Sequence, residues 1–224
     1  MINVSLKNVT KEYRKKIVLN NINLTIESHS LNIILGKSGA GKSTLLNLIG
    51  LLDNPTHGEI IIKDNEIKGL NSNQISDLRM NHIGFVFQSF YLNPKLKAYE
   101  NVMIPMYINN IYKNEDLEKK AKSLLKIFDL EEKFDHLSNE LSGGEQQRVA
   151  IARAIANNPS IIIADEPTGN LDKENEELVL NLFKKLSKEG KSVIIVTHNE
   201  YLTKYADNVF YLSDGNLEEV RWSN

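Results

Sequence analysis

Short apolar runs alternate with longer amphipathic segments along most of this chain. Two runs rich in isoleucine and valine, Ser160–Ala164 and Ser192–Thr197, are typical of parallel strands covered on both faces. A third run, Leu31–Leu35, is as compact and apolar as a buried strand. The helical pattern over about Lys173–Lys188 lies between the first two, so these segments predict a β-α-β unit. Further strands are predicted at Ile2–Val9, Ile22–Glu27, Glu59–Lys63, Ile83–Phe87, Val209–Leu212 and Leu217–Val220.

The strand pattern disappears from about Ala98 to Leu137. Apolar residues recur there at helical spacing, at Leu117, Ala121, Leu124, Leu125 and Phe128. We expect a mainly helical insertion in which Pro105 breaks the helical pattern. The chain therefore predicts an α/β architecture with a helical subdomain inserted in its middle.

Composition narrows the class of protein. The chain has 224 residues, 41% of them hydrophobic and 25% charged, which is ordinary for a globular protein with a sizeable core. Its net charge is 27 − 29 = −2, so no strong field attracts nucleic acid. The absence of cysteine excludes disulfides and thiolate metal sites. We find neither an apolar run near the roughly 18 residues of a membrane span nor a signal-peptide pattern, and expect a cytoplasmic chain.

A glycine-rich loop stands between an apolar strand and an apolar helix. It follows the pattern G-x-x-x-x-G-K-[ST], and its residues are Gly36, Lys37, Ser38, Gly39, Ala40, Gly41, Lys42, Ser43 and the following Thr44. Glycines let backbone N–H groups turn around an anion, and the helix start adds its positive dipole end. We expect Lys42 to reach the β- and γ-phosphates and the Ser43 hydroxyl to hold Mg²⁺. A chance glycine turn is the alternative, but the setting favours a nucleotide loop.

Two carboxylates and a histidine follow apolar strands. Asp165 and Glu166 end the run Ile161–Ala164, and His198 follows the run that ends at Thr197. Ligands of open α/β sheets gather at the carboxyl ends of strands. We expect Asp165 to orient Mg²⁺, Glu166 to polarise an attacking water, and His198 to hydrogen-bond a γ-phosphate. The alternative is that acidic residues simply end a strand at the surface.

The segment Leu141–Arg148 combines a capping signal with paired glycines. Ser142 and Glu145 fit the capping box S-x-x-E at a helix start. The box does not account for Gly143 and Gly144, since each glycine weakens a helix start by roughly 1 kcal/mol relative to alanine. Bare N–H groups at a helix N-terminus make an anion site. This second anion site is expected to face a nucleotide on another copy of the chain.

Taken together, these motifs make the sequence closely resemble the nucleotide-binding subunits of ATP-binding cassette (ABC) transporters. The resemblance covers essentially the whole chain. Gly36–Thr44 resembles the Walker A loop, Ile161–Glu166 the Walker B strand, and Leu141–Gln146 the family signature. The remaining motifs match at Gln88 (the Q-loop glutamine), Leu171-Asp172 (the D-loop), His198 (the switch histidine) and Tyr13 (the aromatic position that stacks on adenine).

The resemblance implies a P-loop NTPase cassette and its chemistry. The fold class would be α/β, with a mainly parallel sheet core, an N-terminal antiparallel β region and an inserted helical subdomain. One domain would span 1–224, with its core at about 1–88 and 159–224 and the helical subdomain at about 89–158. The activity would be hydrolysis of ATP with Mg²⁺, which Ser43, Gln88 and Asp165 would hold.

It also implies partners. Two copies would sandwich two ATP molecules, so that Ser142, Gly143, Gly144 and Glu145 of one copy meet the nucleotide on Lys42 of the other. Gln88 would report the γ-phosphate to the residues that follow it, about 89–105, where an integral membrane permease would dock. Insertion packing is the alternative for the apolar residues of that segment. Nucleic acid would not be a partner, and the chain would sit on the inner face of the membrane through the permease.

Several stretches resemble the macrolide-exporter and lipoprotein-release branch of the family. They are Ile83–Gln88, Glu100–Val102 with Pro105, and Ala164–Asp172. Export of antimicrobial peptides, or resistance to them, is the function we favour, with lipoprotein release or cell-division mechanotransmission as alternatives. A DNA-repair ATPase is disfavoured, because only about fifty residues separate Gln88 from Leu141. A two-cassette translation factor is disfavoured because the chain carries a single cassette.

Overall fold

The computed structural model describes residues 1–109, 112 and 116–220. The remaining residues of the predicted insertion and of the predicted core lie outside this range. The strands are β1 (Ile2–Tyr13), β2 (Lys16–Glu27), β3 (Ser30–Leu35), β4 (His57–Ile62), β5 (Asn65–Glu66), β6 (Ile83–Phe87), β7 (Ile161–Asp165), β8 (Ser192–Thr197), β9 (Asn208–Ser213) and β10 (Asn216–Val220). The helices are α1 (Lys42–Ile49), α2 (Ser72–His82), α3 (Ala98–Ile108), α4 (Leu117–Ile127), α5 (Gly143–Ala154) and α6 (Lys173–Lys188).

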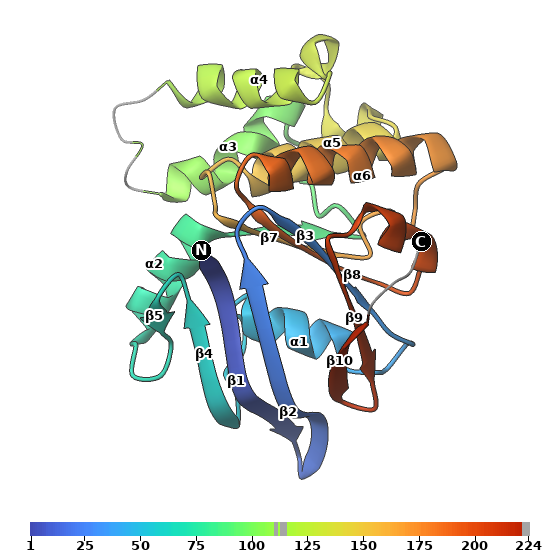
Figure 1. Ribbon diagram of the computed structural model, residues 1–224. Helices are drawn as coiled ribbons and strands as arrows, with labels where there is room; N and C mark the ends of the chain where they lie inside the picture. The colour runs from blue at the N-terminus through green and yellow to red at the C-terminus, as the bar shows by residue number, and fades with distance from the viewer. Residues whose placement is uncertain (110–111, 113–115, 221–224) are drawn as a thin grey trace.

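Two sheets form the framework. The larger sheet has the strand order β10-β9-β3-β8-β7-β6, and all of its pairs are parallel except the β9–β10 hairpin. The smaller sheet is antiparallel and has the order β2-β1-β4-β5. Figure 1 shows the antiparallel sheet below helices α3, α4, α5 and α6. This architecture confirms the α/β prediction, and the chain's N-terminal strands form its antiparallel region.

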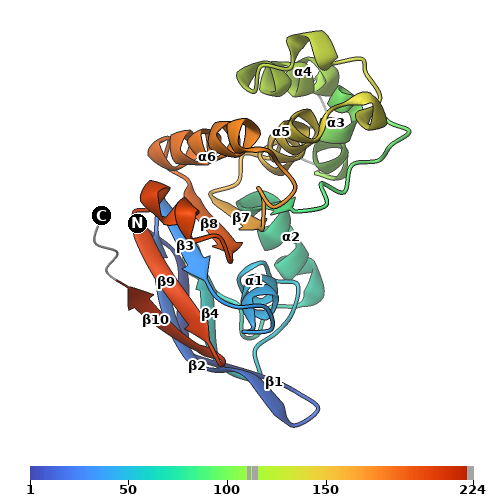
Figure 2. The same cartoon turned by 90° about the vertical axis from the view of Figure 1, so that its right-hand side faces the viewer.

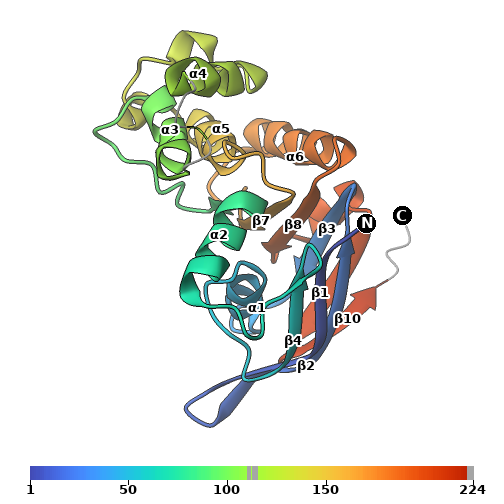
Figure 3. The same ribbon diagram turned by 90° about the vertical axis from the view of Figure 1, so that its left-hand side faces the viewer.

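Alternation along the parallel strands creates two cores. Successive side chains of a strand point to opposite faces, so Ile162 and Ala164 join one cluster while Ile161 and Ile163 join the other. The first cluster packs the sheet against α3, α4, α5 and α6. The second places α1 between the parallel sheet and the antiparallel sheet, as Figures 2 and 3 show from opposite sides. Burial on both faces explains why these strands read as continuous apolar runs.

Proline 105 does not end the helical pattern, contrary to the prediction. It lies inside α3, three residues before that helix ends at Ile108. Val102 and Met106 on either side of it are almost completely buried. Packing of these residues against α4 and α5 holds the helix through the proline, although a proline there removes one backbone hydrogen bond.

The helical segments share a core with the large sheet. The cluster that contains Val102 and Leu125 of the insertion also contains Val86 and Ile162 of the sheet. The division of the chain near residues 88 and 158 therefore stays a prediction. The apolar pattern along the chain also did not indicate helix α2. Helix α2 has no buried residue and begins with a capping box between Asn71 and Gln74.

Candidate functional site

The glycine-rich loop connects β3 to α1. Its last glycine, Gly41, precedes the helix with φ 104°, in a region that residues with a side chain rarely adopt. No side chain caps the start of α1, which leaves its first N–H groups free for another acceptor. Lys42 turns back over the loop, and its Nζ donates to the carbonyl oxygens of Gly36 at 2.7 Å and Lys37 at 3.0 Å. The loop thus presents bare N–H groups and one ammonium at the same place.

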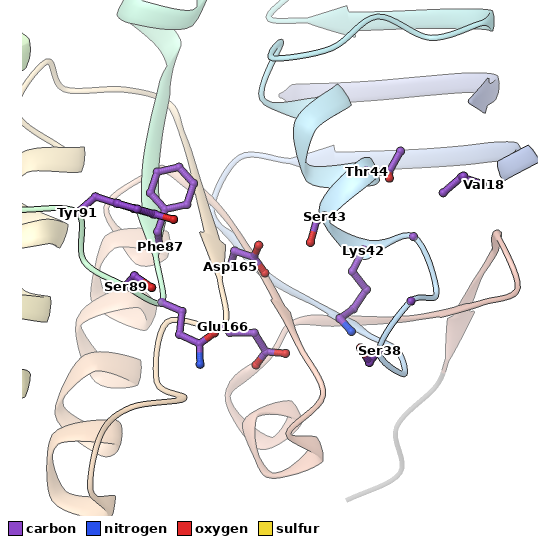
Figure 4. A pocket seen from close by; sticks show the side chains of 13 residues that line it. Val18, Ser38, Lys42, Ser43, Thr44, Phe87, Ser89, Tyr91, Asp165 and Glu166 are labelled. Carbon is purple, nitrogen blue, oxygen red and sulfur yellow. The ribbon is translucent and has the colours of Figure 1, made fainter. Parts of the chain in front are cut away.

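A cavity of about 480 Å³ opens beside this loop. Lys42 and Ser43 line it from the start of α1, and Asp165 and Glu166 line it from the end of β7 (Figure 4). The complete lining is Val18, Ser38, Gly39, Gly41, Lys42, Ser43, Thr44, Phe87, Gln88, Ser89, Tyr91, Asp165 and Glu166. The structure therefore brings the predicted phosphate loop together with the predicted acidic strand end.

Asp165 sits at the half-buried end of β7. Burial raises the pKa of its carboxyl group, and the adjacent Glu166 carboxylate raises that pKa further. Lys42 and a hydrogen bond from Ser43 oppose both effects. A carboxylate in this position gains from a nearby cation, because the cation offsets the cost of keeping the charge out of water. Mg²⁺ fits the site, since it is commonly held by one or two protein oxygens together with substrate phosphates.

Glu166 is held by the end of strand β8. Its carboxylate accepts hydrogen bonds from Thr197 Oγ1 at 2.8 Å and from the backbone N of His198 at 3.0 Å. The ring Nδ1 of His198 lies 2.7 Å from Oε1 of the same carboxylate. The Glu166 backbone has φ 46°, unusual for a residue with a side chain. Glu166 and His198 are thus in direct contact, although the sequence predicted a separate role for each.

Gln88 enters the cavity from the end of β6. Its backbone carbonyl accepts a hydrogen bond from Asn170 Nδ2 at 3.1 Å. A methyl group at Gly169 would stand 2.7 Å from its Nε2, so its side chain passes directly over that glycine. Gln88 therefore touches the turn that follows Glu166 as well as lining the cavity.

Tyr13 lies at the end of β1, beside the cavity lining rather than within it. Its hydroxyl donates to Asp53, and a contact with Thr44 places it next to the start of α1. Lys11 Nζ stands 4.7 Å from the ring centroid and forms a 2.7 Å ion pair with Asp53. No site role was predicted for Lys11 or Asp53. A buried lysine on an alternating strand carries no signal of its own until its carboxylate partner is located.

The signature segment lies apart from the cavity lining. Ser142 is the N-cap of α5, where its Oγ accepts from Glu145 N at 3.4 Å and its N donates to Glu145 Oε2 at 2.8 Å, which confirms the predicted capping box. Glu145 also pairs with Lys133 at 3.3 Å. Burial tends to raise the pKa of Glu145, but bonds from Ser142 and Lys133 outweigh it and the pKa is lowered. Ser142 and Gly143 are exposed at the surface.

An apolar groove of about 740 Å³ lies on the other side of the 87–91 segment. Phe87 and Tyr91 line both the groove and the cavity. Arg153 anchors this shared wall, since its guanidinium donates to the carbonyl oxygens of Phe90 and Tyr91. Of the apolar residues predicted to dock a partner, Tyr91 is exposed, whereas Val102 is buried in the core.

A profile of the ABC transporter family matches residues 19–169. The chain belongs to the ABC transporter family. It is the ATP-binding, ATP-hydrolysing subunit of such a transporter, in the branch that contains LolD-like and MacB-like proteins. No helix in the described part of the chain is long and apolar enough to cross a bilayer.

The similarity to known proteins covers nearly the whole chain. The ABC transporter ATP-binding protein MJ0796 of Methanocaldococcus jannaschii is 47% identical, over 96% of this chain and 95% of that protein. The lipoprotein-releasing system ATP-binding protein LolD of Rickettsia bellii is 46% identical, over 96% of both chains. The macrolide export ATP-binding/permease protein MacB of Pasteurella multocida is 41% identical over 96% of this chain but only 33% of its own length.

A solved structure matches the fold closely. The dimeric structure of MJ0796 in a post-hydrolysis state, with ADP and Pi bound, superposes with a TM-score of 0.86 at 44% identity. The match covers 98% of this chain and 100% of that one.

Proposed function

We propose that this cassette binds Mg-ATP at the phosphate loop and hydrolyses it with Glu166 as general base. The observation that carries this proposal is the convergence of Lys42, Ser43, Asp165 and Glu166 on one cavity from two separate strand ends. Backbone N–H groups of residues 36–44 and the Lys42 ammonium would bind the phosphates. Ser43, Asp165 and Gln88 would hold Mg²⁺, which supplies charge neutralisation on the phosphate oxygens when bound.

The second step of the proposal concerns proton transfer. Glu166 would accept the proton of an attacking water, and its bonds to Thr197 and the His198 backbone orient the carboxylate for that purpose. His198 contacts the same carboxylate through Nδ1, which leaves Nε2 for the γ-phosphate. Tyr13 would stack on adenine, with Lys11 and Asp53 fixing its ring.

The complete site would require a second copy of the chain. Ser142 and Gly143 are exposed at the start of α5, the buried Gly144 follows them, and all three lie outside the cavity that holds Lys42. In the dimer they would meet the γ-phosphate held by the partner copy. Glu145 would contribute by holding Ser142 in its capping position. The dimeric MJ0796 structure supports this arrangement.

The apolar groove would seat a helix of the membrane permease. It is lined mainly by apolar side chains, and Leu52 and Ile108 at its edges are more than half exposed. It shares Phe87 and Tyr91 with the nucleotide cavity, so a helix in the groove would touch the same wall as ATP. The cassette would thereby lie on the inner face of the membrane.

For the transported client, we propose export of antimicrobial peptides or protection against them. Similarity to the macrolide exporter MacB supports an exporter. Lipoprotein release is the second candidate, and similarity to LolD over nearly the whole chain favours it. The two candidates differ in the permease, which carries the client site.

The hydrolysis proposal is tested by Glu166→Gln, with the exposed strand residue Glu66→Gln as the matched control. Loss of a general base should slow steady-state ATP hydrolysis by roughly 10²–10⁴-fold. Mg-ATP should then hold Glu166→Gln as a dimer in size-exclusion chromatography, while Glu66→Gln behaves as wild type. Unimpaired ATP turnover by the Glu166→Gln variant would exclude Glu166 as the general base.

The partner proposal is tested by co-purifying tagged Glu166→Gln from native membranes and identifying bound proteins by mass spectrometry. A permease with a large extracellular domain is the expected result. Recovery of soluble proteins or nucleic acid alone would contradict the permease proposal. Deletion of the captured permease distinguishes the two candidate functions. Sensitivity to peptide antibiotics should change if the transporter exports antimicrobial peptides, and lipoprotein sorting should change if it releases lipoproteins.

A further inference from the structure

The two glycines of the signature have very different surroundings within the single chain. A Cβ added to Gly143 would meet only Leu171 Cδ2, at an ordinary contact distance of 3.9 Å. A Cβ added to Gly144 would stand 2.0 Å from Asn175 Oδ1 and 2.4 Å from Asn175 Cγ. The first position is open, whereas a neighbouring amide already fills the second.

The Asn175 amide is fixed in that place. Its Nδ2 donates to both carboxylate oxygens of Asp172, at 3.1 and 2.9 Å, and its backbone N donates to Asp172 Oδ1 at 2.9 Å. Its Oδ1 accepts from Arg148 of α5 at 3.4 Å. The amide therefore cannot swing away from Gly144 without giving up contacts on both of its ends.

These contacts join the start of α5 to the start of α6. Asp172 is the N-cap of α6, so Asn175 is held against a helix end whose direction the large sheet fixes. Two residues earlier, Asn170 donates to the Gln88 carbonyl at 3.1 Å. A continuous set of hydrogen bonds and chain segments thus runs from the Q-loop through the D-loop to the signature helix.

We propose that Asn175 is a positioning residue that seats the start of the signature helix on the N-cap of α6. Position 144 is then a glycine because the Asn175 amide occupies the space of a side chain. Position 143 is a glycine for another reason, which rests on the proposed function: its open face receives the nucleotide held by the partner copy.

The glycine part is tested by thermal unfolding of the nucleotide-free chain, with Gly143→Ala as the matched control. Crowding at a packed position should make Gly144→Ala lower Tm by roughly 3–8 °C. Gly143→Ala meets no clash and removes a glycine from a helix start, so it should leave Tm unchanged or raise it by up to about 4 °C. The double variant Gly144→Ala/Asn175→Ala should melt within about 2 °C of Asn175→Ala alone, because the clash is removed. Equal shifts for both glycine variants, or additive shifts in the double variant, would overturn this part.

The positioning part is tested by ATP hydrolysis of Asn175→Ala and of Asn175→Asp, which keeps the shape but loses the donor to Asp172. Both should lower kcat by about 10-fold, because a small displacement of a binding group at a reaction site has an effect of at least this size. Mg-free ATP affinity of the monomer should stay unchanged, because the phosphate loop is untouched. Wild-type kcat in Asn175→Ala would overturn the role.

Failure of this inference is distinguishable from failure of the proposed function. The melting experiment uses no nucleotide and no dimer, so it reports on the contact between Gly144 and Asn175 alone. If the dimer proposal were wrong, Gly144→Ala would still lower Tm, but wild-type chain would show no ATP-dependent dimer. If the inference were wrong, the dimer would form and the glycine variants would melt alike.

Discussion

The glycine-bearing N-termini of helices α1 and α5 differ in how their unpaired backbone N–H groups are capped. Both present backbone N–H groups that have no partner within their helix. At α1 the N-cap is Gly41 in a left-handed conformation with no capping side chain. At α5 the N-cap is Ser142, which forms a capping box with Glu145. The first start is left open for a ligand, and the second is partly closed by its own side chains.

Their surroundings differ as well. The start of α1 opens on a cavity that already contains Ser43, Asp165 and Glu166 from the same chain. The start of α5 lies outside the lining of that cavity, with Ser142 and Gly143 at the surface. One half of the proposed site is thus assembled by the fold of a single chain, and under the proposed function the other half is presented to a second copy. The contrast predicts that variants in the two halves fail at different steps.

The largest expected effects distinguish ATP binding by one chain from ATP hydrolysis at the site shared by two copies. Lys42→Ala should weaken ATP binding to the monomer by about 10–100-fold, because charge-assisted hydrogen bonds contribute about 1.5–3 kcal/mol. Gly143→Asp should leave that binding nearly unchanged but lower hydrolysis by about 10²–10³-fold, the range for losing an anion-binding donor. Calorimetry without Mg²⁺ measures the first quantity and phosphate release the second. Weakened monomer binding in Gly143→Asp would contradict the division into halves.

Mixing the two variants sharpens the same comparison. A dimer of one Lys42→Ala chain and one Gly143→Asp chain has one composite site with an intact phosphate loop and an intact signature. Random pairing should therefore restore about a quarter of the wild-type hydrolysis, if the two sites of a symmetric dimer act independently. Activity no higher than the sum of the separate variants would indicate that each chain builds its site alone.

A smaller effect is expected on the free energy of unfolding when the N-cap residues of α1 and α5 are replaced. Gly41→Ala should lower the free energy of unfolding by about 2 kcal/mol, because a side chain at φ 104° is strained and crowds Leu19. Ser142→Ala should lower it by about 1 kcal/mol through loss of the cap. Ser38→Ala, an exposed change in the same loop, should stay within about 0.5 kcal/mol of wild type. Urea unfolding without nucleotide measures all three, and a larger loss for Ser142→Ala would reverse the comparison.

The smallest effect is expected at Asp53, whose carboxylate contacts Lys11 and Tyr13. Burial tends to raise the pKa of Asp53, but bonds from Lys11, Tyr13 and the Asn54 backbone outweigh it and the pKa is lowered. A lowered carboxyl pKa stabilises the fold above the unfolded value near 3.9, and this contribution disappears as pH falls through the folded value. Above about pH 4 the free energy of unfolding of wild type should therefore exceed that of Asp53→Asn by about 1 kcal/mol or less. This difference should disappear as the pH falls below that value. Parallel pH profiles of unfolding would contradict this role.

Much of this architecture was predictable from the sequence, for a physical reason. A strand buried on both faces is mainly apolar, so β8 was predicted with the bounds that the structure gives it. The edge strand β6 was also predicted with its bounds, because its run of apolar residues is continuous even though its two phenylalanines are only half-buried. Helix α6 was predicted equally well, because one apolar stripe faces the core. The phosphate loop was predictable because few residue types permit its backbone, and the capping box at α5 because it is a purely local exchange of hydrogen bonds.

Other features depended on contacts between distant segments. The helix through Pro105 persists because buried neighbours hold it. Helix α2 was missed for a different reason, because it buries no side chain that could have produced an apolar pattern. The contact of Glu166 with His198 joins strands that are adjacent in the sheet but 32 residues apart in the chain. The sequence alone indicated the residues that we propose for phosphate chemistry, since that chemistry depends on residue type and local backbone. Tertiary structure alone decided that the Asn175 amide fills the space beside Gly144, because that contact requires two helices to be packed together.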